Sequence, residues 1–238
     1  TENLSQNWKY LFRNAKTEDV PSTASTLIQA AEGSETLSEV THAINYNKLN
    51  NSLNPTEGYF LGLTTNLAGL GGSQKHFKNL FRGETYYEIA ENWIASLTGN
   101  LGYAFGLGED LHLLERFHLG GANLRGFENR GADPRDTSTD DALGGEWMYT
   151  GSLSLSFPFG LPKDFGIVGR VFSDFGSIGS VSPSNSTTKD SGSIRASTGI
   201  GVTYTSPLGP IGMDYGIPVL KEDYDNEQGF RLTFGARF

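Results

Sequence analysis

The chain of 238 residues contains no cysteine, and it has no run of about 20 consecutive apolar residues of the kind that a spanning helix needs. The absence of cysteine excludes a disulfide framework and any zinc or iron–sulfur site with thiolate ligands. Only 37% of the residues are hydrophobic, and the mean hydropathy is -0.35. A bundle of membrane-spanning helices is therefore excluded.

Positive charge is also scarce, with 18 basic residues against 27 acidic ones and a formal net charge of -9. Nucleic acid is not expected as a partner, because binding there depends on Lys and Arg that neutralise phosphates. The four histidines show no HExxH or similar metal-binding spacing. Glycine-rich segments at 106–110 and 119–126 neither follow a buried strand nor open a helix, so they do not indicate a phosphate-binding loop. We expect no enzyme, no cofactor and no metal site.

Glycine, with 31 residues, and aromatic side chains, at 12%, are both abundant. In residues 149–159, apolar side chains alternate with hydroxyl side chains, so an extended segment there has one apolar and one polar face. The same period of two residues returns in 194–205 and in 229–238. A helix would repeat every 3.6 residues, so the pattern predicts β-strands.

About nine such segments lie between turn signals, near residues 37–49, 59–70, 76–91, 93–107, 146–159, 166–178, 194–205, 209–220 and 229–238. Most are 10 to 14 residues long. Strands of soluble proteins have a mode of about 5–6 residues, whereas a tilted strand that crosses a bilayer needs about 9–11. The predicted fold class is all-β, an antiparallel transmembrane β-barrel. A soluble antiparallel barrel or sandwich is the alternative, because alternation alone does not separate the two.

The connections alternate in length, with short turns at 54–58, 161–164 and 206–209 and long polar loops at 108–145 and 179–193. This asymmetry is typical of outer-membrane barrels, which have short periplasmic turns and longer extracellular loops. The acidic residues at 133–136 and 140–141 are interpreted as a solvated loop rather than a calcium site.

Residues 1–36 are interpreted as another extracellular loop, and residues 37–238 as the barrel. A short helix is predicted over residues 7–13, because Trp8, Leu11 and Phe12 would share one face of two helical turns.

The long loop carries the most specific motif, FHLGGANLRGFENRGADPRDTSTDDALGG at 117–145. It resembles the signature loop of the BamA/Sam50 superfamily of outer-membrane assembly factors, the bacterial surface antigen D15 type of barrel. The C-terminal segments SPLGPIGMDYGIPV and QGFRLTFGARF are similar to the last hairpin of that family. The segment YNKLNNSLNPTEGYFLGL is similar to the hairpin that introduces the second half of the barrel.

The resemblance implies a barrel of sixteen strands, preceded by periplasmic POTRA domains, whose first and last strands meet at a weak seam that can open sideways. Nine strands would leave two open edges, and bacterial single-chain barrels have an even number of strands. We therefore expect the chain to be the C-terminal half of a BamA-like barrel, strands eight to sixteen.

The resemblance also folds the loop 108–145 into the lumen, with Arg125 facing acidic groups on the wall. A guanidinium confined there needs a carboxylate partner. We predict Asp174, which shares the polar face of its segment with Arg170. Many relatives carry a glutamate near Ser154, so the network of Arg125 is expected to rely on Asp174 alone. An ordinary solvated arginine is the alternative.

Six further residues complete the expected site. Gly126 would let the loop turn tightly and Phe127 would anchor it by an apolar contact, next to Leu124 in the same motif. Gly235 would weaken the pairing of the last strand at the seam, or simply accommodate a bulky neighbour. Phe238, together with Phe234, resembles the C-terminal signal of outer-membrane proteins.

The function that the resemblance implies is assembly and insertion of β-barrel proteins into the bacterial outer membrane through the seam. The expected partners are nascent outer-membrane β-barrel proteins, outer-membrane lipid and accessory assembly lipoproteins. A secretion or translocation pore of the same superfamily and a passive porin-like channel or surface antigen are the alternatives. A soluble β-barrel binding protein is the last of them.

Overall fold

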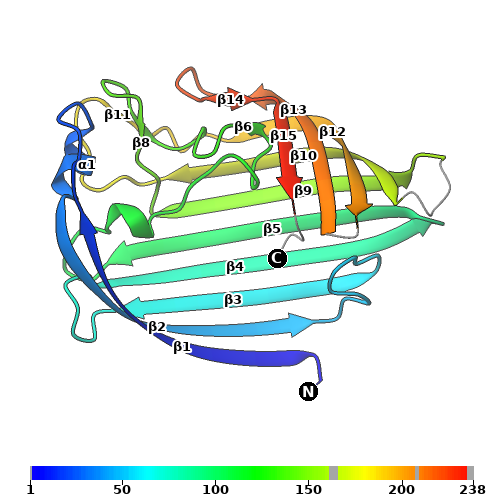
Figure 1. The fold of residues 1–238 in the computed structure, drawn as a ribbon, viewed down its shortest axis with the longest axis horizontal. Coiled ribbons are helices and arrows are strands. Elements are labelled where there is room, and N and C mark those ends of the chain that lie inside the picture. The colour runs from blue at the N-terminus through cyan, green and yellow to red at the C-terminus, as the bar shows by residue number, and fades with distance from the viewer. Residues whose placement is uncertain (1, 161–165, 207–208, 235–238) are drawn as a thin grey trace.

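Ten long antiparallel strands form a curved sheet in the computed structural model, which describes residues 2–160, 166–206 and 209–234 (Figure 1). The order is β1-β2-β3-β4-β5-β9-β10-β12-β13-β15. The bounds are β1 Leu4–Thr17, β2 Gly33–Asn47, β3 Gly58–Ala68, β4 His76–Ala90, β5 Trp93–Gly106, β9 Trp147–Pro158, β10 Ile167–Gly179, β12 Arg195–Ser206, β13 Gly209–Leu220 and β15 Phe230–Phe234. The all-β prediction is confirmed.

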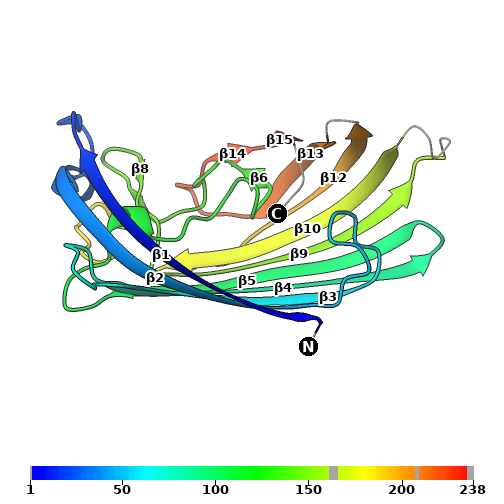
Figure 2. The same ribbon diagram turned by 60° about the horizontal axis from the view of Figure 1, so that its bottom comes forward.

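The sheet is curved, and its two faces differ in character (Figure 2). One row of paired positions across β9, β10, β12, β13 and β15 reads Leu155, Val171, Ile200, Tyr215 and Phe230. The neighbouring row, one residue along, reads Ser154, Phe172, Gly199 and Gly216. The second row lies under the long loop, because a Cβ at Gly216 would lie 2.8 Å from the backbone nitrogen of Gly126 in that loop. Figure 2 shows the loop on the concave face, so the first row, in which Ile200 is 63% exposed, lies on the convex face. We call the concave face the lumen face.

The first strand corrects the prediction for residues 1–36. β1 pairs with β2 at all 14 of its positions, from Leu4 opposite Tyr46 to Thr17 opposite Gly33. Trp8, Tyr10 and Phe12 alternate on the exposed face, a period of two that the helical interpretation of this segment overlooked. Extended pairing satisfies every N–H and C=O along the edge of β2, which a two-turn helix would leave unpaired.

The predicted helix over 7–13 is therefore wrong, as is the interpretation of the segment around it as loop. The described helix of this region is α1 (Thr26–Ala30), which begins after the N-cap residue Ser25. The hydroxyl of Ser25 accepts a hydrogen bond from the backbone N–H of Ile28 at 3.3 Å. No helix in the part of the chain described above has the length and apolarity needed to cross a membrane.

The other nine predicted segments are strands, with ends displaced by no more than a few residues; the last is described only to Phe234. The long loop between β5 and β9 lies on the lumen face (Figure 2). It contains the 3-10 helix η1 (Leu113–Glu115) and the short strands β6 (Gly126–Phe127), β7 (Arg135–Asp136) and β8 (Asp141–Ala142). β6 pairs with β14 (Glu227–Gln228), and β7 pairs with both β8 and β11 (Thr188–Lys189). Pairing thus joins the long loop to the loops after β10 and β13.

Candidate functional site: the lumen loop and its anchors on the wall

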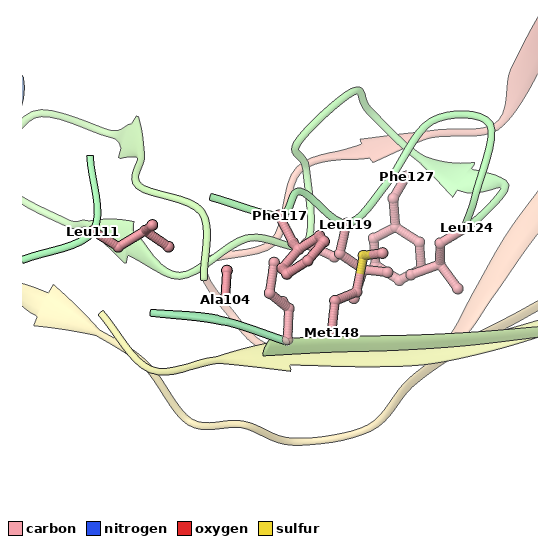
Figure 3. Close-up of a cluster of buried hydrophobic side chains, with 9 residues drawn as sticks. Ala104, Leu111, Phe117, Leu119, Leu124, Phe127 and Met148 are labelled. Carbon is pink, nitrogen blue, oxygen red and sulfur yellow. The ribbon is translucent and has the colours of Figure 1, made fainter. Parts of the chain in front are cut away.

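The long loop packs on the lumen face through an apolar cluster (Figure 3). Wall residues Ala104, Met148 and Ile178 meet loop residues Leu111, Phe117, Leu119, Leu124, Phe127 and Ala132, all less than 7% exposed. Leu124 and Phe127, on either side of the Arg-Gly pair, are 0% exposed. Burying each of these two side chains contributes about 1.5–3 kcal/mol. The position of Phe127 thus agrees with the predicted apolar anchor.

Arg125 makes the opposite kind of contact with the wall. Its Nε and Nη2 donate to the two carboxylate oxygens of Asp174, each at 2.7 Å, and its backbone N–H donates to Oδ2 at 3.1 Å. The two side chains are 3% and 2% exposed, so both charges are largely removed from water and depend on each other. The predicted contact between Arg125 and Asp174 is present. Its role in function stays a prediction.

Three further wall residues surround the guanidinium of Arg125. Nη2 donates to Ser152 Oγ at 3.0 Å, and the guanidinium carbon lies 3.4 Å from the centre of the Phe172 ring. Nη1 lies 3.8 Å from Asp214 Oδ1. The expectation that Asp174 alone holds Arg125 is therefore wrong. The wall supplies two carboxylates, a hydroxyl and an aromatic face.

A second guanidinium–carboxylate pair lies beside the first. Arg170 on β10 donates through Nε and Nη2 to the two oxygens of Asp214, both at 2.7 Å, and through Nη1 to Thr203 Oγ1 at 2.9 Å. The group as a whole contains two guanidinium and two carboxylate charges. In such a balanced set, each charged side chain has an oppositely charged partner at a site that is mostly shielded from water.

Sequence reasoning missed Asp214, although a signal was present. In Gly212–Gly216 the aspartate stands between two glycines on the lumen face, while Met213 and Tyr215 point outwards, 42% and 53% exposed. The alternation therefore placed a carboxylate in the lumen. It did not say which strand lies opposite the loop tip, because that depends on curvature across strands that are distant in sequence.

Gly126 combines a left-handed backbone with close contacts. Its φ is +93°, and a Cβ at this position would lie 3.2 Å from Ser197 Cβ and 3.4 Å from the backbone carbon of Gly216. Gly216 is equally restricted, since a Cβ there would lie 2.8 Å from the Gly126 nitrogen. The tight turn predicted at Gly126 is observed, and the loop backbone passes directly over a glycine of the wall.

A buried aspartate organises the base of the loop. Asp133, 0% exposed, accepts from the backbone N–H of Leu119 at 2.6 Å through Oδ1, and its Oδ2 lies 2.6 Å from His118 Nδ1. Burial raises the pKa of the Asp133 carboxyl above its ordinary value, and the hydrogen bond from His118 opposes that rise. The interpretation of 133–136 as solvated is wrong, because Asp136 is also only 2% exposed.

Asp136 shows the opposite shift. The Ser138 hydroxyl and backbone N–H donate to its Oδ1 at 2.7 and 3.0 Å, and Asn185 Nδ2 donates to Oδ2 at 3.4 Å. These donors, the Ser138 hydroxyl above all, lower the pKa of Asp136 from 3.8 to about 2. The carboxylate therefore helps to join the long loop to the loop after β10.

The predicted C-terminal residues fall in two groups. Phe234 ends the described part of β15 and is 72% exposed, on the same face as Phe230 and Leu232. Gly235 and Phe238 lie outside the described residues. The seam and signal roles of these residues stay predictions.

The fold and the anchored loop define a class of protein: an antiparallel transmembrane β-barrel with a long loop held against its lumen wall. Within that class, the model of the Omp85 superfamily domain matches residues 1–238, and the chain belongs to this superfamily.

Curated relatives agree with this assignment. The outer membrane protein assembly factor BamA of Neorickettsia risticii (strain Illinois) is 31% identical over 215 residues, which cover 90% of this chain and 29% of the relative. The human sorting and assembly machinery component 50 homolog is 29% identical over 153 residues, which cover 63% of this chain and 32% of the relative. The chain thus spans about a third of the length of these relatives or less.

A solved structure shares the fold. The crystal structure of BamA from Haemophilus ducreyi lacking POTRA domains 1-3 superposes with a TM-score of 0.82 at 22% sequence identity. The match covers 99% of this chain and 52% of that chain. The ten-stranded sheet is therefore similar to part of a barrel of known architecture.

Proposed function

We propose that the protein containing this chain assembles and inserts β-barrel proteins into the bacterial outer membrane. The observation that carries the proposal is the buried two-pronged pair of Arg125 and Asp174, which fixes the superfamily's signature loop on the lumen wall. The names of the relatives reported above, assembly factor and assembly machinery component, favour this function over a secretion pore of the same superfamily.

The mechanism rests on unpaired backbone at a sheet edge. Among the described strands, β1 and β15 each have a neighbour on one side only. A nascent strand that enters hydrocarbon with free N–H and C=O groups incurs several kcal/mol for each unsatisfied group. A weakly paired seam next to β15 would offer those groups a partner by strand addition. Nascent outer-membrane β-barrel proteins are the proposed substrates, with outer-membrane lipid and accessory lipoproteins as further partners.

In this mechanism the loop has a mechanical task. β6 pairs with β14, which lies just before β15, and Arg231 of β15 donates to the Phe127 carbonyl oxygen at 3.3 Å. The Arg125 anchor on β10 is therefore connected through the loop to the last strand. A fixed loop would hold β13 and β15 in place while the edge of β15 pairs with an incoming strand.

The test is insertion of a reporter β-barrel into liposomes that contain the full-length protein. We expect faster insertion than into empty liposomes, and at least a 10-fold slower rate for Arg125→Ala. The matched control is Arg82→Ala, which removes a lumen-facing guanidinium on β4. Arg82 Nη2 lies 2.7 Å from Glu84 Oε1 on the same strand. Insertion no faster than into empty liposomes would reject the function, and equal effects of the two variants would reject the role of the loop.

A further inference from the structure

Three potential metal ligands converge on the lumen face, away from Arg125. Glu39 on β2, His76 on β4 and Glu115 in η1 each present one ligand atom, and these atoms all lie within 4.8 Å of one another. His76 Nε2 is 3.1 Å from Glu39 Oε2 and 3.8 Å from Glu115 Oε2. The His76 and Glu39 side chains are 2% and 6% exposed, and that of Glu115 is 13% exposed. No sequence motif marks this trio, because its members come from three distant segments.

Each carboxylate is oriented by its other oxygen. Glu39 Oε1 accepts from Asn66 Nδ2 at 2.7 Å and from Thr41 Oγ1 at 3.3 Å. Glu115 Oε1 accepts from Arg13 Nη2 at 3.4 Å. Both Oε2 atoms are thereby turned towards His76 Nε2. Hydrogen bonds to the outer oxygen of a ligating carboxylate are the usual way in which proteins orient a metal ligand.

The separations suit a small divalent ion. Zinc binds His nitrogen at about 2.0–2.1 Å and carboxylate oxygen at about 2.0–2.2 Å in a tetrahedron, which places neighbouring ligand atoms about 3.4 Å apart. The two distances from Nε2, 3.1 and 3.8 Å, lie on either side of that value. We propose that Glu39, His76 and Glu115 bind Zn²⁺ or a similar first-row divalent cation, with water as the fourth ligand.

Two cationic side chains, Lys78 and Arg13, lie near this trio. Lys78 Nζ lies 3.9 Å from Glu115 Oε2, but it donates to the Glu115 carbonyl oxygen at 2.7 Å and lies 4.9 Å from the centre of the Phe117 ring. The Arg13 side chain is 44% exposed, so water screens its charge. Imidazole and carboxylate together suit zinc, whereas calcium and magnesium prefer oxygen ligands alone.

The ion would connect the long loop to the wall at a second place. η1 belongs to the loop, whereas β2 and β4 belong to the sheet. The Arg125 pair holds the loop to β10, so a metal at Glu115 would fix the part of the loop that precedes the signature motif. This inference concerns binding and does not depend on the proposed function.

The test is a calorimetric titration of Zn²⁺ into metal-free, full-length protein in detergent. The visible absorption of bound Co²⁺ is a second readout. We expect one equivalent to bind to the wild type, and at least 100-fold weaker binding to His76→Ala. The matched control is His42→Ala, which removes an imidazole from the convex side of β2, stacked on Trp8, and is expected to leave binding unchanged.

A Glu115→Gln variant keeps the test decisive if His76→Ala fails to fold, because Glu115 lies in the loop rather than in a wall strand. It is expected to weaken Zn²⁺ binding at least 10-fold while heat-modifiable gel mobility stays that of the folded barrel. Absence of Zn²⁺ binding by the wild type would overturn the site. Equal binding by the wild type and both ligand variants would overturn it as well.

Discussion

At the scale of single residues, the site depends on the shape of the guanidinium as much as on its charge. Arg125 uses Nε and Nη2 on the two oxygens of Asp174, Nη2 also on Ser152, and its flat face on Phe172. An ammonium has one nitrogen and no flat face, so it cannot make these contacts together. Breaking a buried ion pair is costly because the remaining charge keeps its desolvation penalty.

Arg125→Lys is therefore expected to lower the free energy of unfolding by about 1.5–3 kcal/mol, the range for a hydrogen bond to a charged group. Urea unfolding of the full-length protein in liposomes measures this loss. Arg82→Lys is the control, since the Arg82 side chain is 41% exposed and its pair with Glu84 is worth no more than about 1 kcal/mol. Equal losses at the two positions would show that geometry at Arg125 is unimportant.

The backbone at Gly126 gives a second prediction at this scale. Gly126→Ala combines left-handed strain of about 1–2 kcal/mol with the contacts to Ser197 and Gly216. Gly160 has a φ of +73°, and among the described residues no atom beyond its chain neighbours lies within 4 Å of the place that a Cβ would take, so Gly160→Ala measures the strain alone. We expect Gly126→Ala to destabilise the folded protein by at least about 1 kcal/mol more than Gly160→Ala. The same urea unfolding experiment checks it, and equal values would mean that the loop can move away from the wall.

Part of this site could be predicted from sequence. Arg125 was predicted from a motif and Asp174 from the alternation along one strand, and the two side chains are in contact as predicted. The contacts of Phe172 and Asp214 with Arg125 depend on the curvature of the sheet and on the position of the loop tip. Neither can be predicted from the local sequence. The trio of Glu39, His76 and Glu115 was out of reach for the same reason.

At the scale of elements, alternation located nine strands because a lipid-facing strand must alternate at nearly every position. β1 was not predicted as a strand because Leu11, an apolar residue, occupies a lumen-facing position opposite Glu39. Together with Trp8 and Phe12 it gives the spacing of a helix. Whether a segment of that length forms a helix or a strand depends on whether a neighbouring strand pairs with it. Here the partner is β2, and pairing overrides the local pattern.

The facing of the strands can be tested with neighbouring residues on β5. Leu97 is 46% exposed on the convex face, whereas Thr98 lies on the lumen side at the border of a cavity of about 640 Å³ and opposite Glu84. Leu97→Arg is expected to cost roughly 2–4 kcal/mol near the bilayer midplane, and Thr98→Arg to cost less than about 1 kcal/mol. The folded fraction in liposomes measures both. Equal costs would contradict the assignment of the convex face to lipid.

The stability of the junction between the long loop and the loop after β10 should depend on pH. Because the folded-state pKa of Asp136 is lowered to about 2, its stabilising contribution is complete above 3.8 and is lost as the pH falls towards 2. A carboxyl-carbon NMR titration of Asp136 in the full-length protein checks the pKa. Ser138→Ala removes the main donor and should move the midpoint towards 3.8; an unchanged midpoint would show that another group sets it.

At the scale of the whole molecule, the sheet has two edges whose backbone N–H and C=O groups need hydrogen-bond partners. β1 and β15 each lack a second neighbour among the described strands, and free backbone groups at these edges cannot face hydrocarbon. A form embedded in a membrane needs strands on both edges. The ten strands, the lumen loop and the loops paired to it form a continuous unit that can support such closure.

We propose that Arg125 and Asp174 act as one unit that fixes the loop during assembly of other barrels. A double-mutant cycle on the insertion rate of the reporter barrel tests it most directly. Arg125→Ala and Asp174→Ala should each lower the rate at least 10-fold, and the double variant should be about as slow as either single variant. If the two losses multiply, or if neither variant slows insertion, the pair does not act as a unit and does not fix the loop during assembly.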